Sequence, residues 1–212
     1  TVTGAVTEGN TGDAAVTATG AITISDVDGD DTPVFNDVTS TTGGSGYGAF
    51  VLSSNTWIYT LNQSTVQDLD AGDSVTDTIT FTATDSSTQT ITVTINGADD
   101  DAVIGGTVTG AVTEGNIGDA AVTAAGAITI SDVDGDDAPV FNDVTSTTGD
   151  NSYGAFVLTS GTWTYTLDQS AVQDLDAGDS VIDTITFTAT DSSTQTITVT
   201  INGADDDAVI GG

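Results

Sequence analysis

SVTDTITFTATDSSTQTITVTING, residues 74–97, alternates hydrophobic residues with threonine in a two-residue period. The hydrophobic residues of each half fall on one face: Val75, Ile79, Phe81 and Ala83 in the first, and Ile91, Val93 and Ile95 in the second. Because successive side chains of a strand point to opposite faces, this pattern predicts two half-buried β-strands. Threonine fills the other face, where its β-branched, uncharged side chain favours extended backbone and a wettable surface.

The same stretch recurs 106 residues later, as part of a repeat that covers the whole chain. TVTGAVTEGN begins at Thr1 and again at Thr107, so the offset is 107 − 1 = 106, and the two copies differ at 12 positions without insertion or deletion. We therefore predict two domains, residues 1–106 and 107–212, each large enough to bury a core. The second copy ends like the first, in NGADDDAVIGG, and we expect the chain to belong to a longer array.

Each copy contains about seven short strand signals separated by turn residues, which indicates a β-sandwich. The all-β prediction places Trp57 and Tyr59 in the core, on the same face as Leu61. It also places a bulge or kink at Gly20 and a single helical turn in VQDLDAGD, residues 66–73.

The chain of 212 residues has 32 acidic side chains and no Lys, Arg or His. The composition argues against binding to nucleic acid or to an anionic membrane, because both depend on basic side chains that neutralise phosphate, and we expect no direct membrane insertion. The sequence contains no apolar run of about 20 residues and no signal peptide, so we expect any export to be specified elsewhere.

The acidic residues crowd into three places of each copy rather than spreading over the surface. In the first copy these are the turn at residues 26–31, the segment 68–73 and the run Asp99–Asp101, with single acids at Glu8, Asp77 and Asp85. Crowded carboxylates repel one another, and hard cations bind six to eight oxygen ligands. Since His and Cys are absent, the composition favours Ca²⁺ over zinc, copper or iron. The alternative is that the acids only keep the surface soluble.

The sequence also bears on two other functions. Regular threonine rows could make the sandwich a glycan- or ice-binding module. Paired carboxylates such as Asp99 and Asp101 could hydrolyse glycosides, but no His, Cys or Lys is present as base or nucleophile. We expect that the chain is not an enzyme.

The ordered motifs TVTGAVTEGN, ATGAITISDVDGDDTPVF, TWIYTL, VQDLDAGDSVTDTITFTATD and TQTITVTINGADDDAVI resemble the VCBS-type extender repeat of giant bacterial repeats-in-toxin adhesins. The resemblance implies two immunoglobulin-like, cadherin-like β-sandwich domains in tandem, end to end. It also implies a structural spacer that is secreted to the bacterial cell surface and projects an adhesive tip. Its partners would be calcium ions and neighbouring repeats, and we expect the isolated fragment to be monomeric.

A more distant similarity to cadherin repeats implies a calcium site at the seam between the copies. Glu8 is similar to the first-strand glutamate of cadherins, LDAGDS to their LDRE motif, and GADDD to their DxNDN linker, with Gly97 in place of the leading aspartate. The implied ligands are Glu8, Asp70, Asp73, Asp99, Asp100 and Asp101 of the first copy with Asp132, Asp134 and Asp191 of the second. The implied half-sites at the ends are Asp26, Asp28 and Asp85, and Glu114, Asp176, Asp179, Asp205, Asp206 and Asp207.

Overall fold

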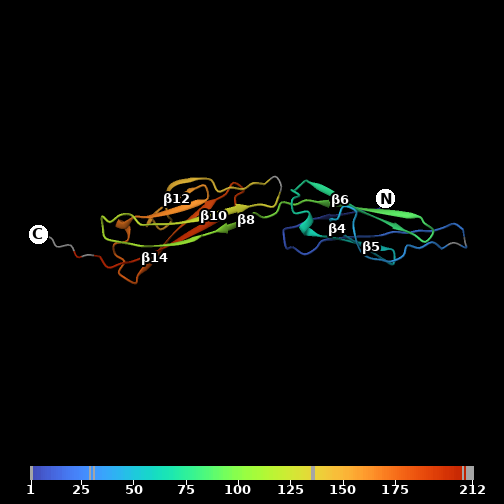
Figure 1. Ribbon diagram of the computed structural model, residues 1–212, viewed down its shortest axis with the longest axis horizontal. Coiled ribbons are helices and arrows are strands. Elements are labelled where there is room, and N and C mark those ends of the chain that lie inside the picture. The colour runs from blue at the N-terminus through green and yellow to red at the C-terminus, as the bar shows by residue number, and fades with distance from the viewer. Residues whose placement is uncertain (1, 29, 31, 135–136, 207, 209–212) are drawn as a thin grey trace. The chain divides into compact units, whose positions relative to one another are not determined.

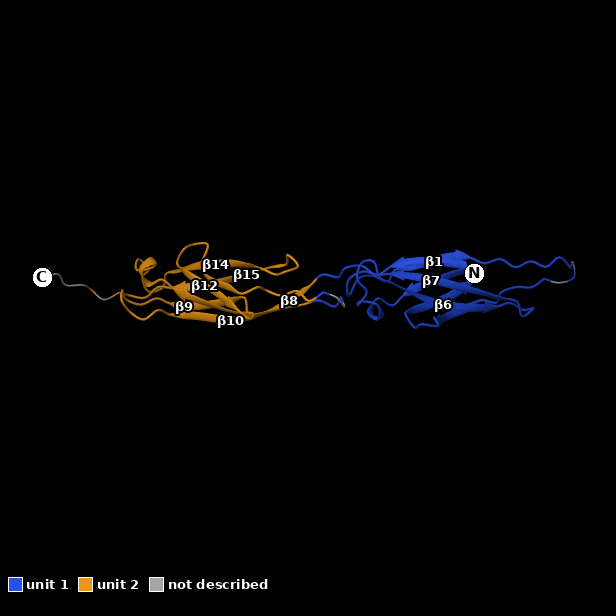
Figure 2. Ribbon diagram, turned by 90° about the horizontal axis from the view of Figure 1, so that it is seen from above, with its two compact units in different colours: residues 1–101, 132–137 blue, residues 102–131, 138–212 orange. Residues whose placement is uncertain are grey.

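The computed structural model describes residues 2–28, 30, 32–134, 137–206 and 208. Among them nearly all regular structure is β, as predicted, and no helix is long and apolar enough to cross a membrane. The chain forms two compact units. Unit 1 comprises Thr1–Asp101 with Asp132–Asp137, and unit 2 comprises Ala102–Ser131 with Ala138–Gly212 (Figure 2). The division into residues 1–106 and 107–212 stays a prediction.

Unit 1 contains seven strands in two sheets (Figure 1). The three-stranded sheet has the order β1 (Val2–Thr7), β7 (Thr88–Asn96), β6 (Ser74–Thr82), and β1 runs parallel to β7. The four-stranded sheet has the order β2 (Thr17–Ala21), β5 (Thr56–Leu61), β4 (Gly48–Ser53), β3 (Val38–Thr42).

Unit 2 repeats this arrangement and adds one strand. Its three-stranded sheet has the order β14 (Ser180–Thr188), β15 (Thr194–Asn202), β9 (Thr109–Thr113). Its second sheet has five strands: β11 (Val144–Thr148), β12 (Gly154–Thr159), β13 (Thr162–Leu167), β10 (Thr123–Ser131) and β8 (Val103–Gly106). The added strand is β8, which pairs antiparallel with the end of β10.

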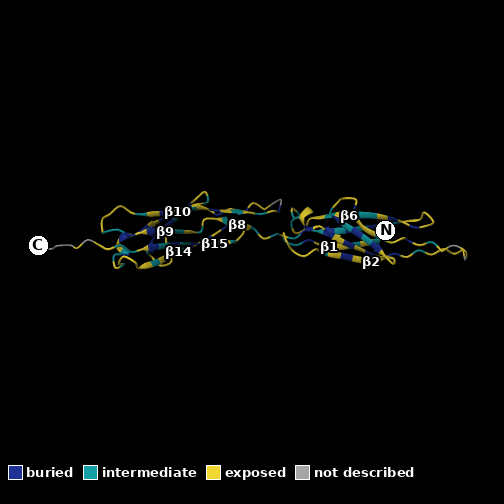
Figure 3. Ribbon diagram, turned by 60° about the horizontal axis from the view of Figure 1, so that its bottom comes forward, coloured by how far each residue is buried: buried dark blue, intermediate teal, exposed yellow. Residues whose placement is uncertain are grey.

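The inward faces of the two sheets make one core in each unit, and Figure 3 shows the buried residues concentrated along the strands. The predicted inward residues Phe81, Ile91, Val93 and Ile95 are buried in unit 1. Trp57, Tyr59 and Leu61 pack with them, at 1%, 0% and 1% exposure, so their core assignment is confirmed.

Two local predictions were wrong. Gly20 is no bulge, because it pairs in register with Trp57, and a Cβ there would lie 2.8 Å from the indole ring. The glycine makes room for that ring. The helical turn, η1, occupies Gln63–Thr65 rather than residues 66–73, because the backbone leaves the helical region at Val66, where φ is −140°. Its counterpart in unit 2 is η2 (Gln169–Ala171).

Candidate metal centre

The acidic groups of unit 1 meet where the end of β1, the segment after β7 and the loop Asp132–Asp137 come together. This loop lies far along the chain yet belongs to unit 1. Its carboxylates of Asp132, Asp134 and Asp137 each offer an oxygen, and these oxygens lie within 4.8 Å of one another. Two oxygens bound to one Ca²⁺ at 2.3–2.6 Å lie at most about 5 Å apart. The spacing therefore suits a single calcium ion.

Glu8 accepts two hydrogen bonds that fix the backbone around this site. Its Oε1 accepts a hydrogen bond from the Ala98 backbone N–H at 2.8 Å, and its Oε2 accepts one from Gln67 Nε2 at 2.8 Å. The side chain is only 5% exposed. A carboxylate at the end of the first strand thereby holds the segment that carries Asp99–Asp101.

The loop at residues 70–73 is tied to the same segment. Asp99 Oδ1 accepts a hydrogen bond from Ala71 N at 2.9 Å, and Gly97 N donates to the Asp73 carbonyl at 3.0 Å. A Cβ on Gly97 would lie 2.4 Å from the carbonyl oxygens of both Leu69 and Asp70. Backbone packing therefore explains why glycine stands where the cadherin linker has an aspartate.

The most buried part of the site joins Asp100 to Asp134. The Asp100 backbone N–H donates to Asp134 Oδ2 at 2.6 Å, and Asp134 is 3% exposed. Among the described residues, none donates a hydrogen bond to Asp100 Oδ2 or to Asp134 Oδ1, although both atoms are buried. An ionised carboxylate oxygen in such a position is costly unless a cation or a donor reaches it.

The electrostatics of the site point the same way. Burial raises the pKa of Asp134 and of Asp100 above the usual aspartate range, and the neighbouring carboxylates raise each pKa further. Burial is also the main cause that raises the pKa of Glu8, with Asp100 and Asp134 adding to it. Since the chain has no Lys, Arg or His, relief must come from a bound cation or from protons.

The structure brings together Glu8, Asp99, Asp100, Asp132 and Asp134 of the predicted seam set. Asp73 contacts the same segment through its backbone carbonyl, which accepts a hydrogen bond from Gly97 N. The Asp70 carbonyl accepts a hydrogen bond from Asp73 N at 2.9 Å. Asp101 N donates to Asn10 Oδ1 at 3.0 Å. Asp191 is different, because it lies in unit 2 and its exposed carboxylate accepts hydrogen bonds from Ser193. These bonds lower the pKa of Asp191.

Asp137 belongs to this acidic cluster but is not among the ligands predicted from the sequence. Its counterpart 106 residues earlier, Asp31, belongs to the acidic turn at residues 26–31, so the repeat itself carried the signal. Asp31 lies outside the described residues.

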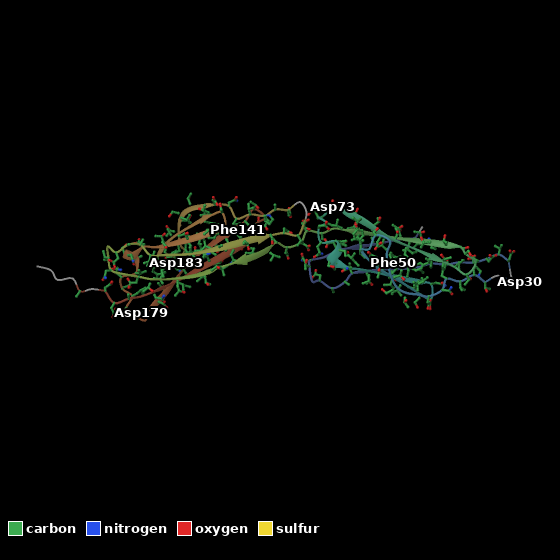
Figure 4. The ribbon with its side chains drawn as sticks, viewed as in Figure 1. Asp30, Phe50, Asp73, Phe141, Asp179 and Asp183 are labelled. Carbon is green, nitrogen blue, oxygen red and sulfur yellow. The ribbon has the colours of Figure 1, made fainter. Side chains whose placement is uncertain are left out.

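The other predicted acidic residues lie in two further places, one in each unit. Asp26, Asp30 and Asp85 line one pocket of unit 1, while Asp28 is exposed and its N–H donates to Asp26 Oδ1. Figure 4 shows Asp30 and Asp73 at opposite ends of unit 1, so this pocket is remote from the Asp134 centre.

Unit 2 contains the same hydrogen bonds around Glu114 that unit 1 has around Glu8. Glu114 accepts hydrogen bonds from Ala204 N and Gln173 Nε2, Asp205 accepts one from Ala177 N, and Asp179 accepts one from Gly203 N through its carbonyl. Asp176 and Asp206 are exposed beside this frame in the sequence, and Asp207 lies outside the described residues.

The comparisons with known proteins agree with this architecture. Residues 99–203 match the family described as bacterial cadherin-like domain. The match covers 105 of the 212 residues, most of them in the second repeat. Cadherin-like domains are structural and adhesion modules without enzyme activity, which agrees with the expectation that this chain is not an enzyme. No curated protein matches the cadherin-like chain.

Several solved structures are similar to the cadherin-like tandem. PcdhgB3 EC1-4 is 16% identical, with a TM-score of 0.49 over 98% of this chain and 48% of that chain. A Ca²⁺-stabilized adhesin that helps an Antarctic bacterium bind ice is 15% identical, with a TM-score of 0.31 over 93% and 45%. The human desmocollin-1 ectodomain is 15% identical, with a TM-score of 0.37 over 97% and 41%. The chain spans about half the length of the first two of these structures.

Proposed function

We propose that this chain is a calcium-rigidified spacer, made of extender repeats from a large secreted bacterial surface adhesin. The observation that carries the proposal is the pair of buried oxygens, Asp100 Oδ2 and Asp134 Oδ1, that no described residue satisfies. The resemblance to adhesin extender repeats and the match to a bacterial cadherin-like family support the adhesin setting.

The ligands of the proposed ion are carboxylates from both sequence repeats. Glu8, Asp99 and Asp100 come from the first, and Asp132, Asp134 and Asp137 come from the second. Because the loop Asp132–Asp137 continues along the chain from β10, an ion held here fastens a loop of the second repeat to the first. A chain of such fastened repeats resists bending, which is what a spacer needs.

Calcium also acts as a folding switch in this proposal. An ion that binds only the native state stabilises that state by mass action. Millimolar Ca²⁺ outside the cell would then keep the array extended, whereas the chain inside the cell would lack the ion and remain pliable for export.

Small-angle X-ray scattering tests the proposal. We expect the wild-type chain to give a narrower distribution of interatomic distances with a longer maximum in millimolar Ca²⁺ than in excess chelator. Asp134→Asn should remove this difference, whereas Asp28→Asn should keep it, because Asp28 is the exposed counterpart of Asp134 in the first repeat. Identical wild-type scattering in Ca²⁺ and chelator would contradict the spacer mechanism.

The glycan- or ice-binding alternative stays a prediction. Some threonine hydroxyls of the outer faces bond to each other, as Thr80 Oγ1 and Thr90 Oγ1 do at 2.9 Å. Hydroxyls engaged in this way have less capacity for a ligand.

A further inference from the structure

The side-chain amide of Gln67 contacts three groups beside the metal centre. Its Nε2 donates hydrogen bonds to Glu8 Oε2 and to the Gly9 carbonyl, both at 2.8 Å. Its Oε1 accepts a hydrogen bond from Thr11 Oγ1. The nitrogen faces two acceptors and the oxygen faces a donor, so the amide has one defined orientation. Gln67 therefore presents its nitrogen, and not its oxygen, to the carboxylate of Glu8.

These hydrogen bonds hold the Glu8 carboxylate and still allow it to bind a cation. An ionised carboxylate has about four acceptor positions, about two on each oxygen. Ala98 N uses one position on Oε1, and Gln67 Nε2 uses one on Oε2. The plane of the carboxylate is thereby fixed, and each oxygen has a second position with which it can bind an ion.

Gln67 also holds the residues that follow Glu8. The Gly9 carbonyl that accepts its hydrogen bond lies next to Asn10 in the chain, and Asn10 Oδ1 accepts a hydrogen bond from Asp101 N at 3.0 Å. One amide thus positions both the glutamate and the segment that contacts the acidic run.

The donor that holds Glu8 carries no charge. A lysine or arginine could make the same hydrogen bond, but its positive charge would offset the charge of Glu8 and weaken the attraction of the centre for Ca²⁺. The chain contains no Lys or Arg. A neutral amide fixes the carboxylate and leaves its whole charge for the ion.

The second repeat has the same amide. Gln173 Nε2 donates to Glu114 Oε2 at 3.0 Å and to the Gly115 carbonyl at 2.7 Å. The third contact has no equivalent there, because Ile117 takes the place of Thr11. The pairing of a glutamine with the first-strand glutamate is therefore common to both repeats and does not depend on the hydroxyl of residue 11.

We propose that Gln67 is a positioning residue of the calcium centre: it fixes the Glu8 carboxylate through a neutral donor and thereby sets the affinity of unit 1 for the ion. This inference rests on the proposed function. Side chains that orient a metal ligand from outside the coordination sphere typically contribute 10–100-fold to metal affinity. Loss of the Gln67 donor should therefore weaken calcium binding by unit 1 about tenfold.

The test is Gln67→Met, which keeps the length of the side chain and removes the donor. The melting temperature of unit 1 is followed by Trp57 fluorescence in a full-length Trp163→Phe background at a series of free Ca²⁺ concentrations, and its rise with Ca²⁺ gives the Kd. We expect a Kd about ten times that of the same chain with Gln67. A purely structural role would lower the melting temperature equally in calcium and in chelator and leave the Kd unchanged.

Gln173→Met is the matched control, because Gln173 makes the same contacts to Glu114 in unit 2 and should not alter the Kd of unit 1. Gln67→Lys restores a donor but adds a positive charge, so it should raise the melting temperature in chelator and still weaken calcium binding. A wild-type Kd in Gln67→Met would overturn this inference and leave the spacer proposal standing. A wild-type Kd in Gln67→Lys would refute the need for a neutral donor. If unit 1 with Gln67 shows no calcium-dependent melting, both proposals fail.

Discussion

Replacing Asp134 by asparagine should change the stability of unit 1 in opposite directions with and without calcium. The asparagine amide keeps the size of the side chain, and its oxygen can still accept the hydrogen bond from Asp100 N that Asp134 Oδ2 accepts at 2.6 Å. The substitution removes one negative charge from a cluster whose ligand oxygens lie within 4.8 Å of one another. Two effects of opposite sign follow from that one change.

Without calcium the variant should be the more stable protein. Two like charges 4.8 Å apart repel by about 1 kcal/mol in water and about 3 kcal/mol at an effective dielectric constant of ~20. Relief of about 1–3 kcal/mol corresponds to a melting temperature some 4–20 °C higher for a domain of about 100 residues. The buried, unsatisfied Asp134 Oδ1 adds to the penalty that the wild type carries.

With calcium the order should reverse. At a free Ca²⁺ concentration of 100 times the Kd, the ion stabilises the native state by about 2.7 kcal/mol. If loss of the Asp134 charge weakens binding about 100-fold, the stabilisation at the same Ca²⁺ concentration falls to about 0.4 kcal/mol. The wild type therefore gains about 10–20 °C from calcium and the variant gains only a few degrees.

The assay is thermal unfolding of the full chain followed by the fluorescence of Trp57, which lies in the core of unit 1, in a Trp163→Phe background. Asp28→Asn is the matched control, because Asp28 occupies the same place in its repeat and is exposed, so its effect should stay within about 0.5 kcal/mol. An equal calcium shift in Asp134→Asn and wild type would refute the assignment of this centre. Superimposed wild-type curves in calcium and chelator would refute calcium binding itself.

Gly97→Ala should destabilise unit 1 by about 1–3 kcal/mol, because the new Cβ would lie 2.4 Å from the carbonyl oxygens of Leu69 and Asp70. Urea unfolding measures this loss. The control Gly44→Ala should be nearly neutral, since the second repeat has Asp150 at that position. Asp77→Ala should lower the free energy of unfolding by at least about 3 kcal/mol, because Asp77 is fully buried and accepts hydrogen bonds from Ser45 N and Gly48 N. The control is Asp37→Ala, since Asp37 is exposed and accepts a hydrogen bond from Ser54 N. An equal loss of stability in the two variants would contradict the prediction. Burial, with Asp77 and Asp183 nearby, raises the pKa of Tyr59 and Tyr165 well above 10. The stabilising effect of the two neutral phenols is therefore complete below the unfolded pKa of about 10 and is lost as the pH rises toward the folded pKa values. Tyrosinate absorbance from these two residues should appear only when circular dichroism shows unfolding. Tyr59→Phe should reduce the size of this absorbance change.

The strands and the core could be predicted from the sequence because their signal is local. The two-residue period of residues 74–97 was enough to place Phe81, Ile91 and Val93 inside. The same period also carries a signal at Asp77. Asp77 lies in phase with Val75 and Ile79, so its side chain points inward, and it is 0% exposed. An aspartate on the buried face of a strand predicts backbone donors from a neighbouring loop, here the glycine-rich turn after β3.

The site was predicted only in part, because its groups are joined by contacts between segments far apart in the sequence. The acidic runs and the resemblance together identified Glu8, Asp100 and Asp134, whose carboxyl groups share one environment. No local rule distinguishes Asp137, which joins the cluster, from Asp191, which instead accepts hydrogen bonds from Ser193. Their positions depend on how the loop Asp132–Asp137 folds onto unit 1.

The two repeats differ at only 12 positions, yet identical residues have different environments in them. Asp134 is buried beside Asp100, while its counterpart Asp28 is exposed. This difference comes from the segment ADDDAVIGG, residues 98–106, which precedes the second repeat and supplies Asp100 and β8. The strands of each repeat form most of its sandwich, whereas the segment before the second repeat supplies the edge strand β8 and the aspartate beside Asp134. Stability should therefore rise with each added repeat by more than one isolated repeat contributes, as expected for a linear array with favourable nearest-neighbour terms.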